Sequence, residues 1–244
     1  MIGRFQDLES IVAFKDLLNR LNCDNLDVRS NSPTLNADFR SQYLMNSRIT
    51  GIDETDLLLL IGTNPKTENP VLNARIRKAV SINGLEVAVI GPANNLTYNY
   101  THLGNSLQTL KELADGTHPY SQKLAEAELP MIVVGSETLT RPDAKAIQDL
   151  IKNLANNSNL INEEEAWNGI NILHTDASRV GALDIGITPR KSTEGAKVVF
   201  LLGADDFDHS DIPEDAFVIY MGTTGDEGAY YADLILPTSS YLEK

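Results

Sequence analysis

Short unbroken runs of apolar residues recur along the chain, and each run stops at a glycine or a proline. The first run, residues 57–61, reads Leu-Leu-Leu-Leu-Ile and is followed by Gly62-Thr63-Asn64-Pro65. A short run that is apolar throughout predicts a strand buried on both faces, as in a parallel sheet. Glycine and asparagine tolerate positive φ and proline has no amide hydrogen, so we expect a sharp turn after this strand. Similar strands are expected at 85–90, 131–134, 198–202, 217–221 and 233–236.

Apolar residues with helical spacing fill most of the intervals between these runs. Residues 7–21 carry such a stripe, and a second helix begins at Pro70 and ends at Asn83-Gly84. Further helices are expected at 105–115, 119–128 and 142–156, with short ones at 38–46, 171–179 and 180–184. The polar segment 22–55 is otherwise poorly assigned. Residues 156–168, around the single tryptophan Trp167, are expected to form a surface loop or a weak helix, and 189–191 a loop.

Strands that alternate with helices of crossover length indicate an α/β fold with a doubly wound, mostly parallel sheet. A chain of 244 residues forms one large domain of this kind or two small ones, and we favour a single domain over residues 1–244. In such sheets ligands bind beyond the carboxyl ends of the strands, where the glycine turns gather. A single glycine there is more often only a tight strand-to-helix connection.

The composition excludes several classes of function. The net charge of −14 argues against general binding to nucleic acid or to anionic membranes, because neutralising phosphates requires clustered cations. Cys23 is the single cysteine, which excludes an internal disulfide and an iron–sulfur cluster held by thiolates of this chain alone. No apolar run approaches the ~20 residues that span a bilayer, so we expect no direct membrane insertion.

Candidate catalytic chemistry is sparse. The sequence has no phosphate-binding loop of the Walker type, no G-x-G-x-x-G after a strand and no nucleophile elbow around Ser136. The histidines have neither metal-binding spacing nor a nearby cysteine, so we expect no metal site. They are His102, His118, His174 and His209.

Two charged groups each have two interpretations. The aspartates after Gly203 are placed to bind a cation or hydroxyl groups, although aspartates in such a loop more often cap a helix. They are Asp205, Asp206, Asp208 and Asp211. The basic residues Arg75, Arg77 and Lys78 either bind an anion or a partner's carboxylates, or form a solvated helix face.

A series of segments matches one family in order along the chain. These segments are 59–65, 73–78, 87–91, 96–98, 102–104, 118–122, 171–174, 201–205 and 232–237. Together they closely resemble the 75 kDa iron–sulfur subunits of respiratory complex I, especially the mitochondrial form. The resemblance covers only part of such a subunit, because the ferredoxin-like amino-terminal region, whose cysteines bind the clusters, is absent. It implies a fragment or one product of a split gene, with the iron–sulfur clusters in the missing amino-terminal part or in partner subunits.

At superfamily level the chain resembles the molybdopterin oxidoreductases, in which glycine-ended turns hold a pterin cofactor. The resemblance marks remains of such turns at Gly62, Asn64, Pro65, Gly203 and Asp205. The second turn departs from the pattern, because Asp205 stands where an Asn-Pro is expected and an acid repels a phosphate. The turn at 91–93 also lacks the acid and the arginine of the enzymes. We therefore expect no catalytic residue and no cofactor in this chain, and a fold incomplete at both ends relative to the family.

The resemblance implies a non-catalytic scaffold in the NADH-oxidising module of the proton-translocating NADH:ubiquinone oxidoreductase. Its partners would be other peripheral-arm subunits, including the iron–sulfur-carrying amino-terminal half, with Arg75, Arg77 and Lys78 as candidate contacts. Its location would be the matrix side of the mitochondrial inner membrane, or else the cytoplasmic face of a bacterial membrane. Two alternatives stay open: a fragment of a molybdopterin-dependent oxidoreductase, and a nucleotide-binding α/β module that uses the 62–65 turn and the helix at Pro70.

Overall fold

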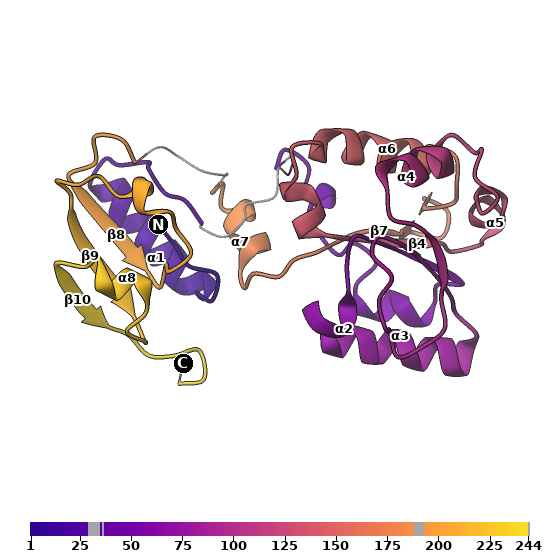
Figure 1. Ribbon diagram of the computed structural model, residues 1–244, viewed down its shortest axis with the longest axis horizontal. Helices are drawn as coiled ribbons and strands as arrows, with labels where there is room; N and C mark the ends of the chain where they lie inside the picture. Colours follow the sequence, from indigo (N-terminus) through magenta and orange to yellow (C-terminus); the bar gives the residue numbers. More distant parts are fainter. Residues whose placement is uncertain (29–34, 36, 188–192, 244) are drawn as a thin grey trace. The chain divides into compact units, whose positions relative to one another are not determined.

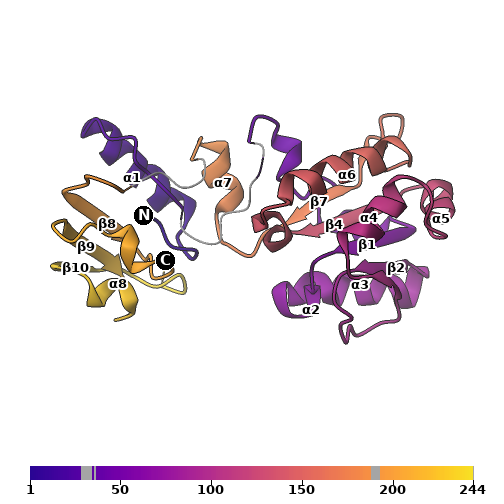
Figure 2. The same cartoon turned by 45° about the horizontal axis from the view of Figure 1, so that its top comes forward.

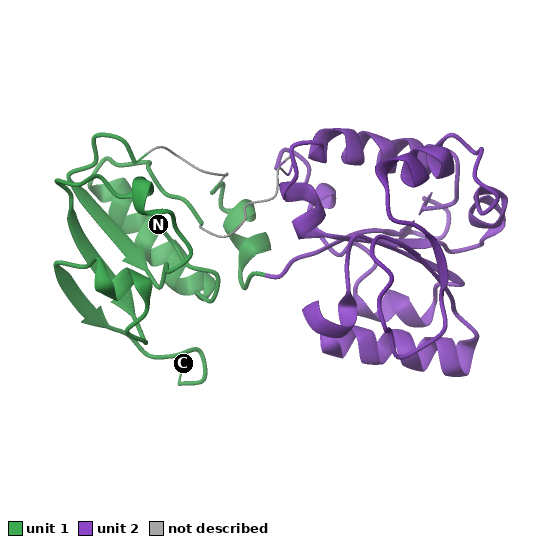
Figure 3. Cartoon of the chain, in the orientation of Figure 1, with its two compact units in different colours: residues 1–32, 176–244 green, residues 33–175 purple. Residues whose placement is uncertain are grey.

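The computed structural model describes residues 1–28, 35, 37–187 and 193–243. The chain divides into two compact units (Figure 3). Unit 1 comprises residues 1–32 and 176–244, and unit 2 comprises residues 33–175. The sequence had favoured one domain, but the last three strands pair with one another and do not extend the first sheet, so each unit has a sheet and a core of its own.

Unit 2 is built on a five-stranded sheet with the order β3-β2-β1-β4-β7, in which every pair is parallel. The central strand β1 pairs with β2 on one side and β4 on the other, with Leu59 opposite Ala88 and Ile132. All five residues of β1 are buried, as the unbroken apolar run predicted. The strands are β1 (Leu57–Ile61), β2 (Glu86–Ile90), β3 (Thr101–Gly104), β4 (Met131–Gly135) and β7 (Ile170–Leu173).

Helices cover both faces of this sheet, so the doubly wound α/β fold is confirmed. The helices α2 (Pro65–Glu68) and α3 (Pro70–Asn83) lie on one face, and α4 (Leu107–Ala114) and α6 (Ala144–Asn156) lie on the other (Figures 1 and 2). Helix α3 has proline at its first position and ends at Gly84 with φ +74°, which only glycine adopts without strain. The remaining helical segments of unit 2 are α5 (Ser121–Glu126), η1 (Arg40–Gln42), η2 (Ile49–Asp53) and η3 (Ser136–Thr140).

Unit 1 has a smaller parallel sheet with the order β10-β9-β8. Helix α1 (Leu8–Arg20) begins at Asp7, whose carboxylate accepts a hydrogen bond from the Ser10 amide at 2.9 Å. Its buried Phe14 packs edge-on against Phe200 of β8, with 5.6 Å between ring centroids. The other elements are β8 (Val198–Leu202), β9 (Phe217–Gly222), β10 (Leu234–Pro237), α7 (Arg179–Asp184), α8 (Glu227–Tyr230) and η4 (His209–Asp211).

Several sequence expectations were wrong in the segments with weak patterns. The helix expected at 171–179 is replaced by strand β7, and the helix expected at 38–46 is only the 3₁₀ turn η1. Asn171 is fully buried in β7, and its side-chain amide donates to the carbonyls of Ile132 and Gly169 at 3.2 and 3.1 Å. Pairing with β4 satisfies the backbone hydrogen bonds of this segment, whereas a short helix is only marginally stable by itself. Residues 29–34 and 36 of the poorly assigned segment, and the loop expected at 189–191, lie outside the described residues.

Trp167 is a core residue and not a surface residue. It belongs to the short antiparallel pair β5 (Ile161–Asn162) and β6 (Trp167–Asn168). Its side chain is 7% exposed, and the indole Nε1 donates to the carbonyl of Pro130 at 2.9 Å. It joins Leu58 and Leu60 in the core of unit 2, so its fluorescence reports on the folding of that unit. Among the described residues, none of the helices is long and apolar enough to cross a membrane.

We expect Leu60→Ala to lower the free energy of unfolding of unit 2 by about 2–5 kcal/mol, because it opens a cavity beneath the central strand. Urea unfolding of the full chain, followed by Trp167 fluorescence, measures the change. The control is Ile82→Ala, since Ile82 lies in the same unit but is 70% exposed; its expected effect is within about 0.5 kcal/mol. An equal decrease in the free energy of unfolding in the two variants would show that burial of the β1 side chain Leu60 does not stabilise unit 2.

Candidate functional site

The turn after β1 brings backbone segments very close together at the carboxyl edge of the sheet. Gly62 has φ +57°, and its amide donates to the carbonyl of Ile90 at 2.8 Å. A Cβ at Gly62 would lie 2.0 Å from Oγ1 of Thr138, and a Cβ at Gly135 would lie 2.6 Å from the Gly62 carbonyl oxygen. Glycine is therefore required at Gly62 by its positive φ and the nearby Thr138 side chain, and at Gly135 by the close approach of the Gly62 carbonyl.

Glu68, at the end of α2, supplies the acceptors for this turn. Its carboxylate accepts from the hydroxyl of Thr63 at 2.5 Å through Oε2 and from the amide of Asn64 at 2.7 Å through Oε1. Thr63 is only 5% exposed, so its hydroxyl needs a partner within the protein. The donors that an anionic ligand would use at this turn are thus already bound by a carboxylate of the same chain.

Asn64 and Pro65 shape the start of α2, a helix that the sequence did not reveal. The Asn64 side-chain oxygen accepts from the Lys66 amide at 3.2 Å, and Pro65 occupies the first helical position. The Lys66 ammonium donates to the carbonyl of Asn95 at 2.9 Å, which holds the loop after β2 against this helix. In this conformation Asn64 and Pro65 serve the backbone of the turn itself.

The turn after β8 in unit 1 repeats this arrangement with Asp205. Gly203 has φ +54° there, and its amide donates to the carbonyl of Met221 at 2.7 Å. The Asp205 carboxylate accepts from the amide of Gly228, in α8, at 2.9 Å and from the hydroxyl of Tyr220 at 3.4 Å. Asp205 therefore joins the end of β8 to α8 and β9.

The environment of this second turn disfavours additional negative charge. Burial raises the pKa of the Asp205 carboxyl above its usual value, although the hydrogen bond from Gly228 opposes that shift. Burial together with the charge of Asp205 raises the pKa of Tyr220 to about 12. The charge on Asp205 is thus already costly, and a second anion beside it would increase the cost.

A carboxylate lies in or beside each turn, and its charge disfavours a phosphate or a pterin pyrophosphate there. At the first turn Glu68 accepts from the Asn64 amide, and beside the second turn Asp205 accepts from the amide of Gly228 in α8. Either carboxylate would repel a further anion. Glu68 was missed in the sequence, because it stands four residues after the helix-capping Asn64, one position beyond the capping-box spacing. Tyr220 was also missed, because its contact with Asp205 depends on how β9 pairs with β8.

The remaining acids of the 205–211 loop have local structural roles. The Asp211 carboxylate accepts from the amide of Asp208 at 3.2 Å at the start of η4, in agreement with the capping interpretation. Asp206 is exposed and lies 4.0 Å from the guanidinium of Arg4. Within the described ranges, no group of three or more His, Cys, Asp or Glu side chains is placed to hold a metal ion.

The histidines lie apart from one another and make local contacts. The ring nitrogens of His102 and His174 lie 2.8 Å from the Gly91 carbonyl and 2.7 Å from the Tyr43 carbonyl, respectively. His118 accepts from the amide of Tyr120 at 3.1 Å, and His209 lies 3.3 Å from the Tyr231 hydroxyl. Ser136 is buried at the start of η3.

The basic residues of α3 do not act as one group. The Arg75 guanidinium donates twice to Asp53, at 3.1 Å from Nε and 2.5 Å from Nη2, and this bond holds the pKa of that carboxyl below its usual range. Arg77 and Lys78 are both exposed. They follow one another in sequence, so the helix separates their directions by about 100°.

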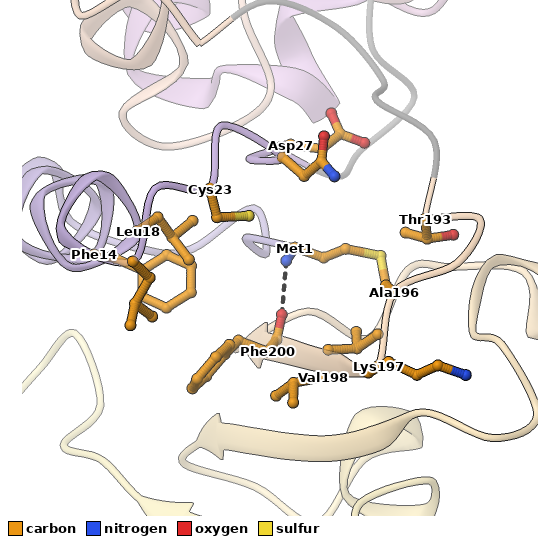
Figure 4. Close-up of a pocket in the computed structure, with 13 residues that line it drawn as sticks. Met1, Phe14, Leu18, Cys23, Asp27, Thr193, Ala196, Lys197, Val198 and Phe200 are labelled. Carbon is orange, nitrogen blue, oxygen red and sulfur yellow. Dashed lines mark hydrogen bonds between the residues drawn. The ribbon is translucent and has the colours of Figure 1, made fainter.

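A pocket of about 290 Å³ lies in unit 1 between α1 and the sheet (Figure 4). Phe14 and Leu18 of α1, with Cys23 close to Leu18, line one side, and Phe200 of β8 lines another. The amino group of Met1 donates to the carbonyl of Phe200 at 2.6 Å across it. Its wall is mainly apolar and belongs to the core of this unit.

Comparisons with known proteins show which family the chain belongs to. The sequence matches the molybdopterin oxidoreductase family over residues 1–244. It is 43% identical over 244 residues to the NADH dehydrogenase [ubiquinone] iron-sulfur protein 1 of Solanum tuberosum mitochondria, covering 99% of this chain and 33% of that protein. It is 42% identical over 265 residues to the 75 kDa subunit of Reclinomonas americana NADH-ubiquinone oxidoreductase, covering 100% of this chain and 38% of that protein. The resemblance to complex I subunits is confirmed, and the chain spans about a third of the length of these relatives.

A solved structure supports the fold. The formyltransferase/hydrolase complex (FhcABCD) of Methylorubrum extorquens, in complex with methylofuran, contains a chain that superposes with a TM-score of 0.66 at 15% identity. The match covers 98% of this chain and 79% of that one. At this level of identity it bears on the fold alone.

We expect Glu68→Ala to lower the free energy of unfolding of unit 2 by roughly 1–3 kcal/mol, because the buried Thr63 hydroxyl and the Asn64 amide lose their acceptor. Glu68→Gln keeps an acceptor oxygen and should lose less. Trp167 fluorescence during urea unfolding gives the values. Exposed Glu54→Ala is the control, with an expected change within about 0.5 kcal/mol. A Glu68→Ala variant as stable as the control would rule out the assigned role.

We also expect unit 1 to become less stable, relative to Asp205→Asn, as the pH rises from about 4 to about 7. The folded state binds the Asp205 proton more tightly than the unfolded chain does, so ionisation through the raised folded pKa costs stability. Hydrogen-exchange mass spectrometry of β8 and β9 peptides, comparing both proteins at each pH, measures the difference. Asp206→Asn removes the same charge from the exposed neighbour and is the control. If the stability of unit 1 in the wild type, relative to Asp205→Asn, increased with rising pH, the result would contradict the role assigned to Asp205.

Proposed function

Because the chain belongs to the molybdopterin oxidoreductase family, we propose that it keeps the family's fold but serves as a non-catalytic scaffold within the 75 kDa subunit of respiratory complex I. The identity of 42–43% to complex I subunits, over the whole of this chain, supports that assignment. Fold alone does not assign function, so the case for a scaffold rests on the two strand-end turns.

The observation that carries the proposal is the pair of internal carboxylates at those turns. Glu68 binds the donors after β1, and Asp205 binds the donor next to the turn after β8. A pterin cofactor is held through its phosphates, and both carboxylates oppose a phosphate at these positions. The turns therefore present carboxylates where a cofactor would need free donors.

The role of such a scaffold is positional. It would hold neighbouring subunits of the peripheral arm, among them the polypeptide that carries the iron–sulfur clusters, so that the clusters stay within electron-transfer distance. The proposal places the chain in the NADH-oxidising module on the matrix side of the mitochondrial inner membrane. Clusters and NADH chemistry then belong to other parts of the assembly, in keeping with the single cysteine of this chain.

We expect an affinity tag on the chain, expressed in the organism that makes it, to recover NADH-oxidising activity together with an iron–sulfur polypeptide. Elemental analysis of the recovered complex should find iron, with molybdenum and tungsten far below one atom per chain. The untagged strain is the control for adventitious recovery. Molybdenum or tungsten in stoichiometric amount, or an extractable pterin that is lost on Asn64→Ala, would establish a cofactor-dependent enzyme in its place. Recovery of the chain without NADH-oxidising activity would contradict its assignment to this complex.

A further inference from the structure

Helix α3 also has apolar side chains outside the face that packs on the sheet. Leu72, Ile76 and Ala79 are buried against the strands, as an amphipathic helix requires. Outside this buried face, on one flank of the helix, Val71 is 76% exposed and Ile82 is 70% exposed. The two residues are eleven positions apart, which is close to three helical turns, so they lie on one line along the helix.

A groove of about 310 Å³ runs beside this line. Val71, Ala74, Arg75 and Lys78 of α3 form one wall, and Ile49 of η2 forms the other. Ile49 is itself 48% exposed. The groove is therefore lined by the apolar side chains of Ile49, Val71 and Ala74 together with the cations Arg75 and Lys78. We name the set Ile49, Val71, Ala74, Lys78 and Ile82 the outer stripe.

The charge around the outer stripe is opposite to that of the chain as a whole. The elements η2 and α3 contain three cations, Arg75, Arg77 and Lys78, and a single acid, Asp53, in a chain of net charge −14. Asp53 is already bound by Arg75. Among the residues that the structure describes, Lys78 makes no ion pair within 4 Å, so its charge is available to a partner.

We propose that the outer stripe is the docking site for an acidic amphipathic helix of a partner polypeptide. The groove between two apolar ridges suits a helix that presents apolar side chains at every third or fourth position. The cation at Lys78 suits an aspartate or glutamate on that helix. The stripe is about 16 Å long, which a partner helix of about three turns spans. The inference rests on the proposed scaffold role and names the chemistry of one of its partners.

A second copy of this chain is a poor occupant of the same site. Two outer stripes packed against each other would bring the Lys78 cations of both copies to one interface, where like charges repel. A partner with carboxylates beside its apolar residues both covers Val71 and Ile82 and neutralises Lys78.

The test places a photo-reactive benzoylphenylalanine at Val71 or at Ile82 in the tagged full chain, within the host cell. The same residue at Arg77, on another side of α3, is the matched control. We expect crosslinks from 71 and 82, and not from 77, to a peptide with apolar residues at helical spacing and an excess of Asp and Glu. We also expect Lys78→Glu to lower the crosslink yield at Val71 roughly tenfold, and Arg77→Glu to leave it within about twofold.

The following outcomes of the crosslinking experiment would contradict the proposed docking site. Crosslinks to a basic or extended segment, crosslinks to another copy of this chain, or yields at 71 and 82 no higher than at 77 would overturn it, as would equal effects of Lys78→Glu and Arg77→Glu. Trp167 fluorescence of each variant confirms that unit 2 is folded when the crosslinks are read. Recovery of NADH-oxidising activity is scored separately, so failure of the scaffold role and failure of the docking site give different results.

Discussion

Buried hydrogen-bond donors must find acceptors, and at the carboxyl ends of two strands this chain supplies those acceptors itself. Gly62 and Gly203 turn the backbone with positive φ at the ends of β1 and β8. In the first turn Glu68 accepts from Thr63 and Asn64, and in the second Asp205 accepts from Gly228. A carboxylate satisfies these donors more strongly than a neutral acceptor does, and its charge opposes an anionic ligand at the same place.

At these turns the glycines and the acids have different roles: the glycines allow close backbone packing, and the acids affect which ligands can bind. The close approach of Gly62 and Gly135 is set by strand packing, since β1 and β4 lie side by side and a Cβ would not fit. Strand packing is needed by a scaffold as much as by an enzyme, so the glycines remain useful when no cofactor is bound. The acids bear on the chemistry, because a carboxylate at the turn competes directly with a phosphate.

The surface of unit 2 adds a second constraint, which concerns partners. Helix α3 must bury Leu72 and Ile76 to cover the sheet, which leaves Val71 and Ile82 exposed on one flank of the helix. Apolar residues at that exposure add nothing to the core, and their position beside Lys78 gives the surface a chemical character different from that of the acidic chain around it. The three basic residues of α3 have different situations: Arg75 binds Asp53, Lys78 borders the groove, and Arg77 points elsewhere.

The sequence by itself determined the strongly patterned parts of this protein. The apolar run at 57–61 and the prolines and glycines around it fix β1 and α3 to within a residue or two, because complete burial and backbone sterics leave few alternatives. Tertiary structure decided the weakly patterned parts. The segment at 170–173 is a strand because β4 is its neighbour, Trp167 is buried because Pro130 offers it an acceptor, and the last three strands form a sheet of their own. It also decided what the turns can bind, since Glu68 and Asp205 meet their donors only once helices and strands have brought them together.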